Sequence, residues 1–131
     1  YLSAEGILVE DVCVSSSIRF FEEHLFQVYV QRQYSATNEL EEFMTKDLKE
    51  EENTHMDALV RGKENESTLN RAVMKSKTGN VLYFGETIQL MHVKSGKFIT
   101  VRPADLARDE RENMKVTLST DGSVMSWLKV M

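Results

Sequence analysis

Clusters of apolar residues mark the first part of the chain as strand-forming. Short runs of β-branched, aliphatic and aromatic side chains occur at residues 7–9, 12–14 and 25–30, and polar residues separate them. Runs of this length and composition are typical of short strands in a sheet. The pattern therefore predicts three strands before residue 34.

The middle of the chain changes to a helical period. Apolar residues recur there at i, i+3, i+4 and i+8, which places them on one face of a helix. These residues are Leu40, Phe43, Met44 and Leu48. Either Ser35 or Thr37 is suited to cap the N-terminus, because a side-chain hydroxyl there accepts a hydrogen bond from a free backbone N–H. A first helix is predicted to start at this point.

Two shorter helices are predicted to follow. Thr54 and the acidic residue three positions later resemble a capping box, and Gly62 is suited to end a helix over residues 56–61. Ser67 is suited to cap a third helix, which we expect to end near Gly79. The apolar stripe of this third helix consists of Leu69, Ala72 and Val73.

From residue 81 onward the period is again that of strands. One face of the first of these strands carries Ile88, Leu90 and His92. A turn at residues 94–97 and a return strand at 98–101 predict a hairpin that Pro103 closes. Two further strands are expected at 114–118 and 126–130, on either side of an Asp-Gly turn.

The two β segments resemble one unit written twice, with the helical segment inserted between the copies. Residues 1–3 correspond to 98–100, residues 12–14 to 116–118, and residues 25–28 to 127–130. Such a unit buries its apolar face only by stacking on further copies. The expected division is a partial first repeat at 1–34, a helical arm at 35–80 and a second repeat at 81–131.

Two copies would leave an open sheet edge, which a closed barrel removes. We therefore expect a further repeat beyond Met131 or supplied by another chain. Phe26 and Trp127 hold equivalent places in the two repeats and are interpreted as core side chains, each stabilising the fold by roughly 2 to 3 kcal/mol.

Composition restricts the classes of function. The 131 residues are 41% hydrophobic and 28% charged, which fits one folded domain and excludes wholesale disorder. Neither a membrane span nor a signal peptide is visible. The net charge is −5, with −3 in residues 1–34, −6 in 35–66 and +4 in 67–131, so nucleic acid and anionic lipid are not expected partners. Cys13 is the single cysteine and is expected to be a small buried residue in a reducing environment.

No motif in the sequence supports catalysis or cofactor binding. Three scattered histidines and one cysteine do not form a zinc pattern, and the acidic run near residue 50 lacks the spacing of a calcium loop. The six glycines are dispersed, so no phosphate-binding loop is present. The sequence thus predicts a protein that is not an enzyme and has no cofactor.

Several segments together resemble the N-terminal domain of inositol trisphosphate and ryanodine receptors. Residues 85–101 resemble the opening of a trefoil repeat, and residues 113–118 with Ser126 and Trp127 resemble the strands that follow. The Leu-x-His-x-Lys-Ser pattern that begins at Leu90 is closer to inositol trisphosphate receptors. The family's first strand, with its Gly-Asp opening, is missing before Tyr1, and the connection over residues 15–20 is short.

The resemblance implies a mainly β fold, a β-trefoil of the MIR-like type with an inserted helical arm, incomplete in this chain. It implies a regulatory domain of a homotetrameric calcium-release channel on the cytosolic face of the endoplasmic reticulum or another calcium store. Such a domain modulates inositol trisphosphate affinity and gating through adjacent ligand-binding domains and neighbouring subunits, without binding the ligand, nucleic acid or membrane. Asp57, Arg61 and Lys63 on the arm are candidates for a contact with a neighbouring subunit.

An alternative of another class is a MIR-type trefoil module of a lumenal complex related to protein O-mannosyltransferases. That module shares the Leu-x-His hairpin, whereas the lone cysteine and the helical arm speak against it. Five residues are predicted to belong to the structural core of the β segments. These residues are Phe26, Leu90, His92, Phe98 and Trp127.

Overall fold

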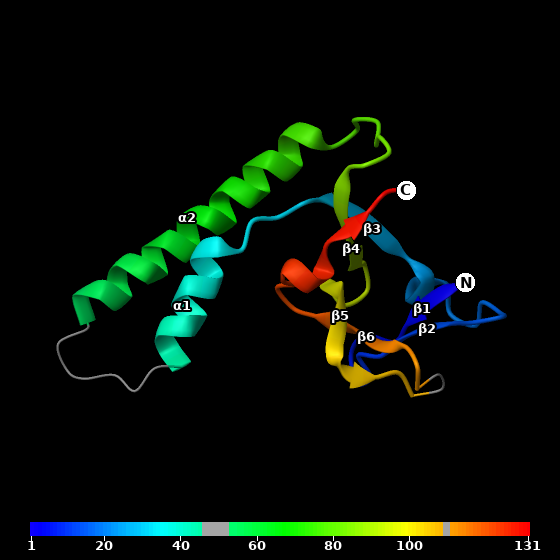
Figure 1. The fold of residues 1–131 in the computed structure, drawn as a ribbon. Helices are drawn as coiled ribbons and strands as arrows, with labels where there is room; N and C mark the ends of the chain where they lie inside the picture. The colour runs from blue at the N-terminus through cyan, green and yellow to red at the C-terminus, as the bar shows by residue number, and fades with distance from the viewer. Residues whose placement is uncertain (46–52, 109–110) are drawn as a thin grey trace. The chain divides into compact units, whose positions relative to one another are not determined.

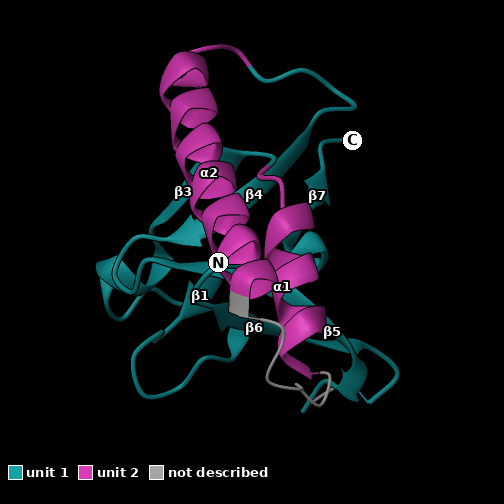
Figure 2. Cartoon of the chain, turned by 90° about the vertical axis from the view of Figure 1, so that its left-hand side faces the viewer, with its two compact units in different colours: residues 1–31, 82–131 teal, residues 32–81 magenta. Residues whose placement is uncertain are grey.

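The structure, a computed structural model, describes residues 1–45, 53–108 and 111–131. The chain divides into two compact units (Figure 2). Residues 1–31 and 82–131 form one unit, called the β unit below, and residues 32–81 form the other, called the helical arm. The β unit contains all the described strands and two short 3-10 turns, and the helical arm contains the two described α-helices (Figure 1).

The β unit begins with a small two-stranded sheet. Strand β1 (Leu2–Ala4) pairs antiparallel with β2 (Val12–Val14). The pairing places Ser3 opposite Cys13, and residues 5–11 connect the two strands. The prediction of a strand at 12–14 is confirmed, whereas the prediction of a strand at 7–9 is wrong, because those residues lie in the connection.

The larger sheet has the order β3–β4–β5–β6. It consists of β3 (Phe26–Val30), β4 (Thr87–His92), β5 (Lys97–Leu106) and β6 (Met114–Ser119), and β7 (Leu128–Lys129) pairs with β4. All pairs are antiparallel, and Gly96 adopts a φ of 69° in the turn that joins β4 to β5. The predicted hairpin is confirmed. Its return strand extends past Pro103 through an irregularity between Arg102 and Leu106, where a residue without an N–H interrupts the ladder.

The registers of the two sheets support the internal repeat. In the small sheet Leu2 lies opposite Val14, and in the large sheet Ile99 lies opposite Leu118. Under the sequence correspondence, Leu2 matches Ile99 and Val14 matches Leu118, so the two pairings are the same. Each β5–β6-type pair is followed by a 3-10 turn, η1 (Phe21–His24) in the first copy and η3 (Val124–Ser126) in the second. A strand follows each turn, β3 in the first copy and β7 in the second.

The second copy of the last strand is shorter than predicted. Residues 126 and 127 were expected to begin it, but Ser126 ends η3 and Trp127 caps that turn. Ser123 caps the other end of η3: its Oγ accepts the Met125 N–H at 3.1 Å, and its own N–H reaches the Ser126 Oγ at 3.0 Å. Ser126 is fully buried and also bonds the Thr100 hydroxyl at 2.7 Å, so its polar atom is satisfied in the core.

The apolar core of the β unit joins both copies. Ala4, Ile99 and Leu118 form its buried centre. Partly buried side chains pack around them, namely Val12, Phe26, Leu90 and Val116. The predicted mainly β fold with an inserted helical arm is confirmed, and the described strands do not close into a barrel.

The helical arm consists of α1 (Ser35–Thr45) and α2 (Asn53–Lys77). The predicted first helix is confirmed, although Leu48 lies outside the described residues. The prediction of separate second and third helices is wrong, because α2 runs through Gly62 and Ser67 without a break. A glycine inside a helix costs only about 1 kcal/mol relative to alanine. An added Cβ at Gly62 would lie 3.6 Å from the Ala36 Cβ, an ordinary contact distance, so packing does not require a glycine there.

Polar side chains of α2 hold the start of α1. The Glu66 carboxylate accepts hydrogen bonds from the Ala36 N–H at 2.8 Å and from the Thr37 N–H at 3.1 Å. Asn70 bonds both backbone groups of Gln33, at 2.8 and 2.9 Å. The cap of α1 thus comes from another helix rather than from Ser35 or Thr37, whose hydroxyls bond Glu66 instead.

Two burial predictions are wrong. Leu69 and Val73 of the expected apolar stripe are 66% and 46% exposed, whereas the polar Glu66 and Asn70 are buried. Cys13 is exposed, because it lies on the short outer strand β2.

Candidate interaction site

The connection between β1 and β2 presents an apolar tip to solvent. We call residues 5–10 the 5–10 loop. Ile7, Leu8 and Val9 at its tip are 60%, 89% and 53% exposed. Exposure of consecutive aliphatic side chains to water is unfavourable, and their burial by a partner lowers the free energy. The tip is therefore a candidate docking surface.

The Glu5 carboxylate holds the backbone of the tip in one conformation. The donors are the N–H groups of Ile7, Leu8 and Val9, at 2.9, 2.7 and 3.0 Å from its Oε2 atom. The hydrogen bonds from Val9, Ile7 and Leu8 lower the pKa of Glu5 below its usual 4.5, because they stabilise the ionised form. The loop is closed by a further bond from the Gly6 N–H to the Val9 carbonyl at 2.9 Å.

The C-terminal end of the loop is fixed on β6 and its neighbours. The Glu10 carbonyl accepts the Leu118 N–H at 2.8 Å, and Asp11 forms a bridge with Thr117. The Glu10 carboxylate pairs with the Lys97 ammonium on β5, and the Asp11 carboxylate lies 2.9 Å from the Lys115 ammonium. Hydrogen bonds and ion pairs thus hold the loop on both sides of its tip.

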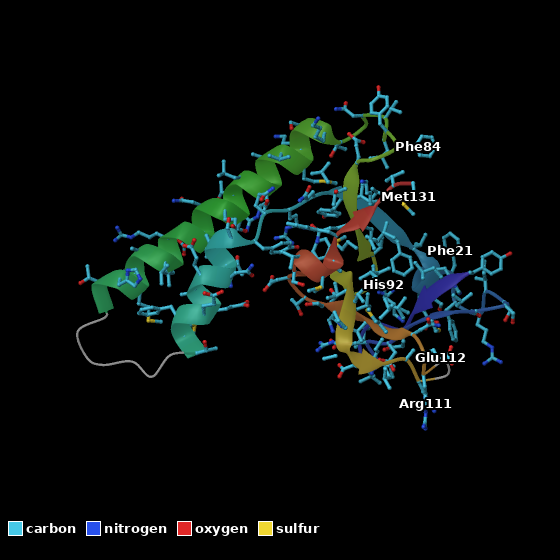
Figure 3. The ribbon with its side chains drawn as sticks, in the orientation of Figure 1. Phe21, Phe84, His92, Arg111, Glu112 and Met131 are labelled. Atoms are coloured by element: carbon cyan, nitrogen blue, oxygen red, sulfur yellow. The ribbon has the colours of Figure 1, made fainter. Side chains whose placement is uncertain are left out.

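A buried histidine lies beneath the N-terminal end of the loop. His92 is fully buried (Figure 3), and its Nδ1 lies 2.9 Å from the Ser95 Oγ. The Phe26 ring packs against the imidazole at a centroid distance of 5.2 Å. Gly6 adopts a φ of 81°, and a Cβ there would lie 2.6 Å from the His92 Nδ1. Only glycine therefore fits between the loop and the ring.

Lys94 joins the loop to the neighbouring turn. Its ammonium lies 3.9 Å from a Glu5 carboxylate oxygen and 3.6 Å from one of Glu23 in η1. Partly exposed ion pairs of this kind contribute little stability individually. The Lys94 ammonium balances the charges of these two carboxylates and leaves the apolar tip uncovered.

The arrangement is suited to contact rather than to chemistry. In the described part of the chain, no group of three or more histidine, cysteine or acidic residues is placed to hold a metal ion. Charged groups around the tip are in ion pairs, and the exposed side chains of the tip are aliphatic. Such a surface is suited to contact with an apolar partner surface.

The candidate contact residues of the arm do not form one surface. Asp57 and Arg61 are exposed and four residues apart on α2, which places them on one face. Lys63 is half-buried, and at about 100° per residue it lies on a different side of the helix from Arg61. The structure thus brings two of the three together.

The predicted core residues lie in the β unit at different depths. His92 and Phe98 are buried, and Phe98 meets the Tyr29 ring edge-on at 5.3 Å. Phe26 and Leu90 are partly buried against the core centre, and Trp127 is half-buried at the end of η3.

The sequence patterns did not identify the residues of the tip as a surface. Ile7, Leu8 and Val9 were assigned to a strand because their composition is that of a strand. The internal repeat contains the missed signal. Counted from the correspondence of 12–14 with 116–118, residues 7–9 match residues 111–113, which lie between β5 and β6 and so outside the ladder.

The described fold is a mainly β unit with a helical insertion, and its exposed apolar loop tip is a candidate contact surface. All of residues 1–131 match the family model described as inositol 1,4,5-trisphosphate/ryanodine receptor, and the chain belongs to that family. It is 33% identical over 139 aligned residues to the inositol 1,4,5-trisphosphate receptor itr-1 of Caenorhabditis elegans. The alignment covers 97% of this chain and 5% of that relative's length. The family resemblance seen in the sequence is confirmed.

Proposed function

We propose that the chain is a regulatory module of an intracellular calcium-release channel and acts through contact. In this proposal the 5–10 loop docks its apolar tip on an adjacent ligand-binding domain of the same channel. Docking lowers inositol trisphosphate affinity and influences gating, which makes the module a suppressor. The observation that carries the proposal is the tip of Ile7, Leu8 and Val9, which is exposed although its backbone is fixed by Glu5.

The partner is inferred from the size of the relatives. The chain corresponds to 5% of the length of the similar receptor, so most of such a channel is available to cover the tip. A preformed loop loses little conformational entropy on docking, and this favours binding. The expected setting is a homotetramer in an intracellular calcium-store membrane, with this module on the cytosolic face.

The ion pairs of three lysines in the β unit are consistent with a module that does not itself bind the ligand. An inositol phosphate needs several free basic groups, because its phosphates are multiply charged. Lys94, Lys97 and Lys115 are each paired with a carboxylate of the same unit. The family match gives no support to the alternative of a mannosyltransferase module.

Ligand titration of the full-length channel tests the docking proposal. The variant Ile7→Ser, Leu8→Ser and Val9→Ser removes the apolar tip and leaves Glu5 and the backbone hydrogen bonds unchanged. Loss of a coupling free energy of about 1 to 3 kcal/mol raises inositol trisphosphate affinity by about 5- to 150-fold. The matched control is Leu69→Ser with Val73→Ser, which removes exposed aliphatic residues from α2 instead. Unchanged affinity in the loop variant, or the same increase in the control, contradicts the proposal.

The arm is proposed to contribute a subunit contact through Asp57, Arg61 and Lys63. Asp57 and Arg61 share a face of α2 and are expected to act together, whereas Lys63 acts from another side. Charge reversal of Asp57 and Arg61 weakens cross-linking between subunits of the full-length channel if they form that contact. The division into repeats at 1–34 and 81–131 with the arm at 35–80 belongs to the same proposal.

A further inference from the structure

We propose that His92 makes docking by the 5–10 loop sensitive to pH: protonation of its buried ring releases the loop, so that acid weakens the docking contact. The inference rests on the proposed function for the role of the docked loop. The release itself depends only on the described contacts of the β unit.

Steric contact couples the ring to the loop. Gly6 sits directly on the imidazole, and the space for a Cβ there is taken by the His92 Nδ1, at 2.6 Å, and the Ser95 Oγ, at 2.9 Å. The loop therefore covers the ring and keeps water from it. Movement of the loop away from β4 would expose the Nδ1 side of the ring to solvent.

The hydrogen-bonding state of the ring suits the neutral form. Ser95 satisfies Nδ1, and Nε2 is buried with no hydrogen-bond partner among the described residues. An imidazolium has two N–H donors, and both need acceptors. Charging the ring in place would bury a charge whose Nε2–H makes no hydrogen bond in the closed loop, although the Glu22 carbonyl is near, and this is unfavourable.

Charges of both signs surround the ring. On β3 the neighbour is Phe26, and that strand contains no charged residue. Lys97 on β5 lies opposite His92 in the register and is neutralised by Glu10. The charged and titratable residues on the elements around the ring are Glu5 and Glu10 of the loop, Glu22, Glu23 and His24 of η1, Tyr29 of β3, Lys94 of the turn, and Lys97, Arg102 and Asp105 of β5.

Burial determines the direction in which this environment shifts the titration. It lowers the pKa of His92 below the usual 6.5, and Lys94 acts in the same direction. The Glu22 carbonyl and the carboxylates of Glu23 and Glu5 oppose the shift without reversing it. The Glu22 carbonyl favours the charged ring by its proximity but does not reach hydrogen-bond geometry with Nε2.

The sign of the pH effect follows from this lowered value. With the loop open the ring titrates near its usual pKa, so the open state binds a proton more readily than the closed state. Stability of the closed loop is complete above pH 6.5 and is lost as the pH falls below it. Glu5 has a lowered pKa and remains ionised in this range, so its hydrogen bonds to the loop persist. At pH 5.5 the equilibrium shifts toward the open loop by at most about tenfold.

Hydrogen–deuterium exchange of the full-length channel tests the release. Protection of the peptide containing the 5–10 loop is compared at pH 7.5 and 5.5, after correction for intrinsic exchange rates. Wild-type protection is expected to fall by up to about tenfold at pH 5.5. His92→Asn is expected to show no such fall, because an amide can keep the Ser95 hydrogen bond and does not titrate. His55→Asn on α2 is the matched control and should behave as wild type.

Each result decides the inference. A fall in the wild type and in the His55 variant, but not in the His92 variant, supports it. An equal fall in the His92 variant, or no fall in the wild type, overturns it. If His92→Asn does not fold, His92→Gln replaces it as the non-titrating side chain. Ligand affinity measured in the same samples separates the two proposals: loop release without a change of affinity contradicts the docking function and leaves the histidine switch intact.

Discussion

At some positions of the β unit, close contact with a neighbour restricts which amino acid is accepted. Gly6 illustrates this, because two independent constraints require a glycine at one position. Its φ of 81° is unfavourable for other residues, and the His92 ring fills the space of a side chain. Neither constraint is visible in the sequence, where Gly6 is one of six dispersed glycines.

Gly6→Ala is therefore expected to destabilise the fold more than another glycine substitution with the same backbone strain. Strain at positive φ contributes about 1 kcal/mol, and displacement of the His92 ring or the loop adds about 1 to 2 kcal/mol. Gly96→Ala is the matched control, since its φ is 69° and no atom lies within 4 Å of an added Cβ. Denaturant unfolding measures both free energies. Equal losses in the two variants would show that His92 does not restrict the position.

At the scale of elements, local patterns predicted strands better than they predicted helix burial. The strands at 12–14, 25–30 and 114–118 were found because their composition differs from that of their surroundings. The helices were located, but their packing face was not, because the face of α2 toward α1 contains Glu66 and Asn70. These residues are buried through bonds to backbone groups about 30 positions away in the chain, which no local pattern contains.

The same long separation explains why the site was missed and the family was recognised. The family resemblance depended on strand motifs, and each of these motifs is a contiguous stretch of sequence that can be recognised without the structure. The surface of Ile7, Leu8 and Val9 depends instead on the hydrogen bonds of Glu5 and on the contact of Gly6 with His92, which lies 86 positions later in the chain. Exposure of an aliphatic run follows from such contacts and not from its own composition.

Glu66 makes the start of α1 sensitive to acid. Burial raises the pKa of this carboxyl, but the hydrogen bonds from Ala36, Thr37 and Ser35 together lower it by more. The pKa of Glu66 therefore lies below 4.5. The stabilisation is therefore complete above pH 4.5 and is lost as the pH falls through the lowered value. In the wild type, exchange protection of the Ala36 and Thr37 amides should decrease over that acidic range.

Glu66→Gln should remove most of this dependence and weaken the arm at neutral pH. The variant loses a charged acceptor of four hydrogen bonds, at a cost of about 1 to 3 kcal/mol. Glu64→Gln, at an exposed position on the same helix, is the control and should leave both the protection and its pH dependence unchanged. Similar losses in the two variants would argue against the cap.

For the molecule as a whole, the described strands leave the large sheet with open edges, and β3 lies at one of them. Within the described residues, β3 and β7 each pair with β4 alone. The Val93 N–H bonds the Leu25 carbonyl at 2.9 Å, so by alternation the backbone groups of Phe26, Val28 and Val30 point away from β4. None of the residues of β3 is charged, and such an edge is a template for another strand.

The edge of β3 predicts that the 131-residue chain self-associates in isolation and that one charge on this strand prevents it. Val28 is 40% exposed, so Val28→Lys places an ammonium at the edge without emptying the core. Pairing with a second strand would desolvate that charge, which is unfavourable. At high protein concentration, light scattering should therefore show a lower mass for the Val28 variant than for the wild-type chain. Leu69→Lys adds the same charge at a more exposed aliphatic position on α2. If the Leu69 variant dissociates the chain equally well, general charge or apolar exposure, rather than strand pairing through β3, controls the association.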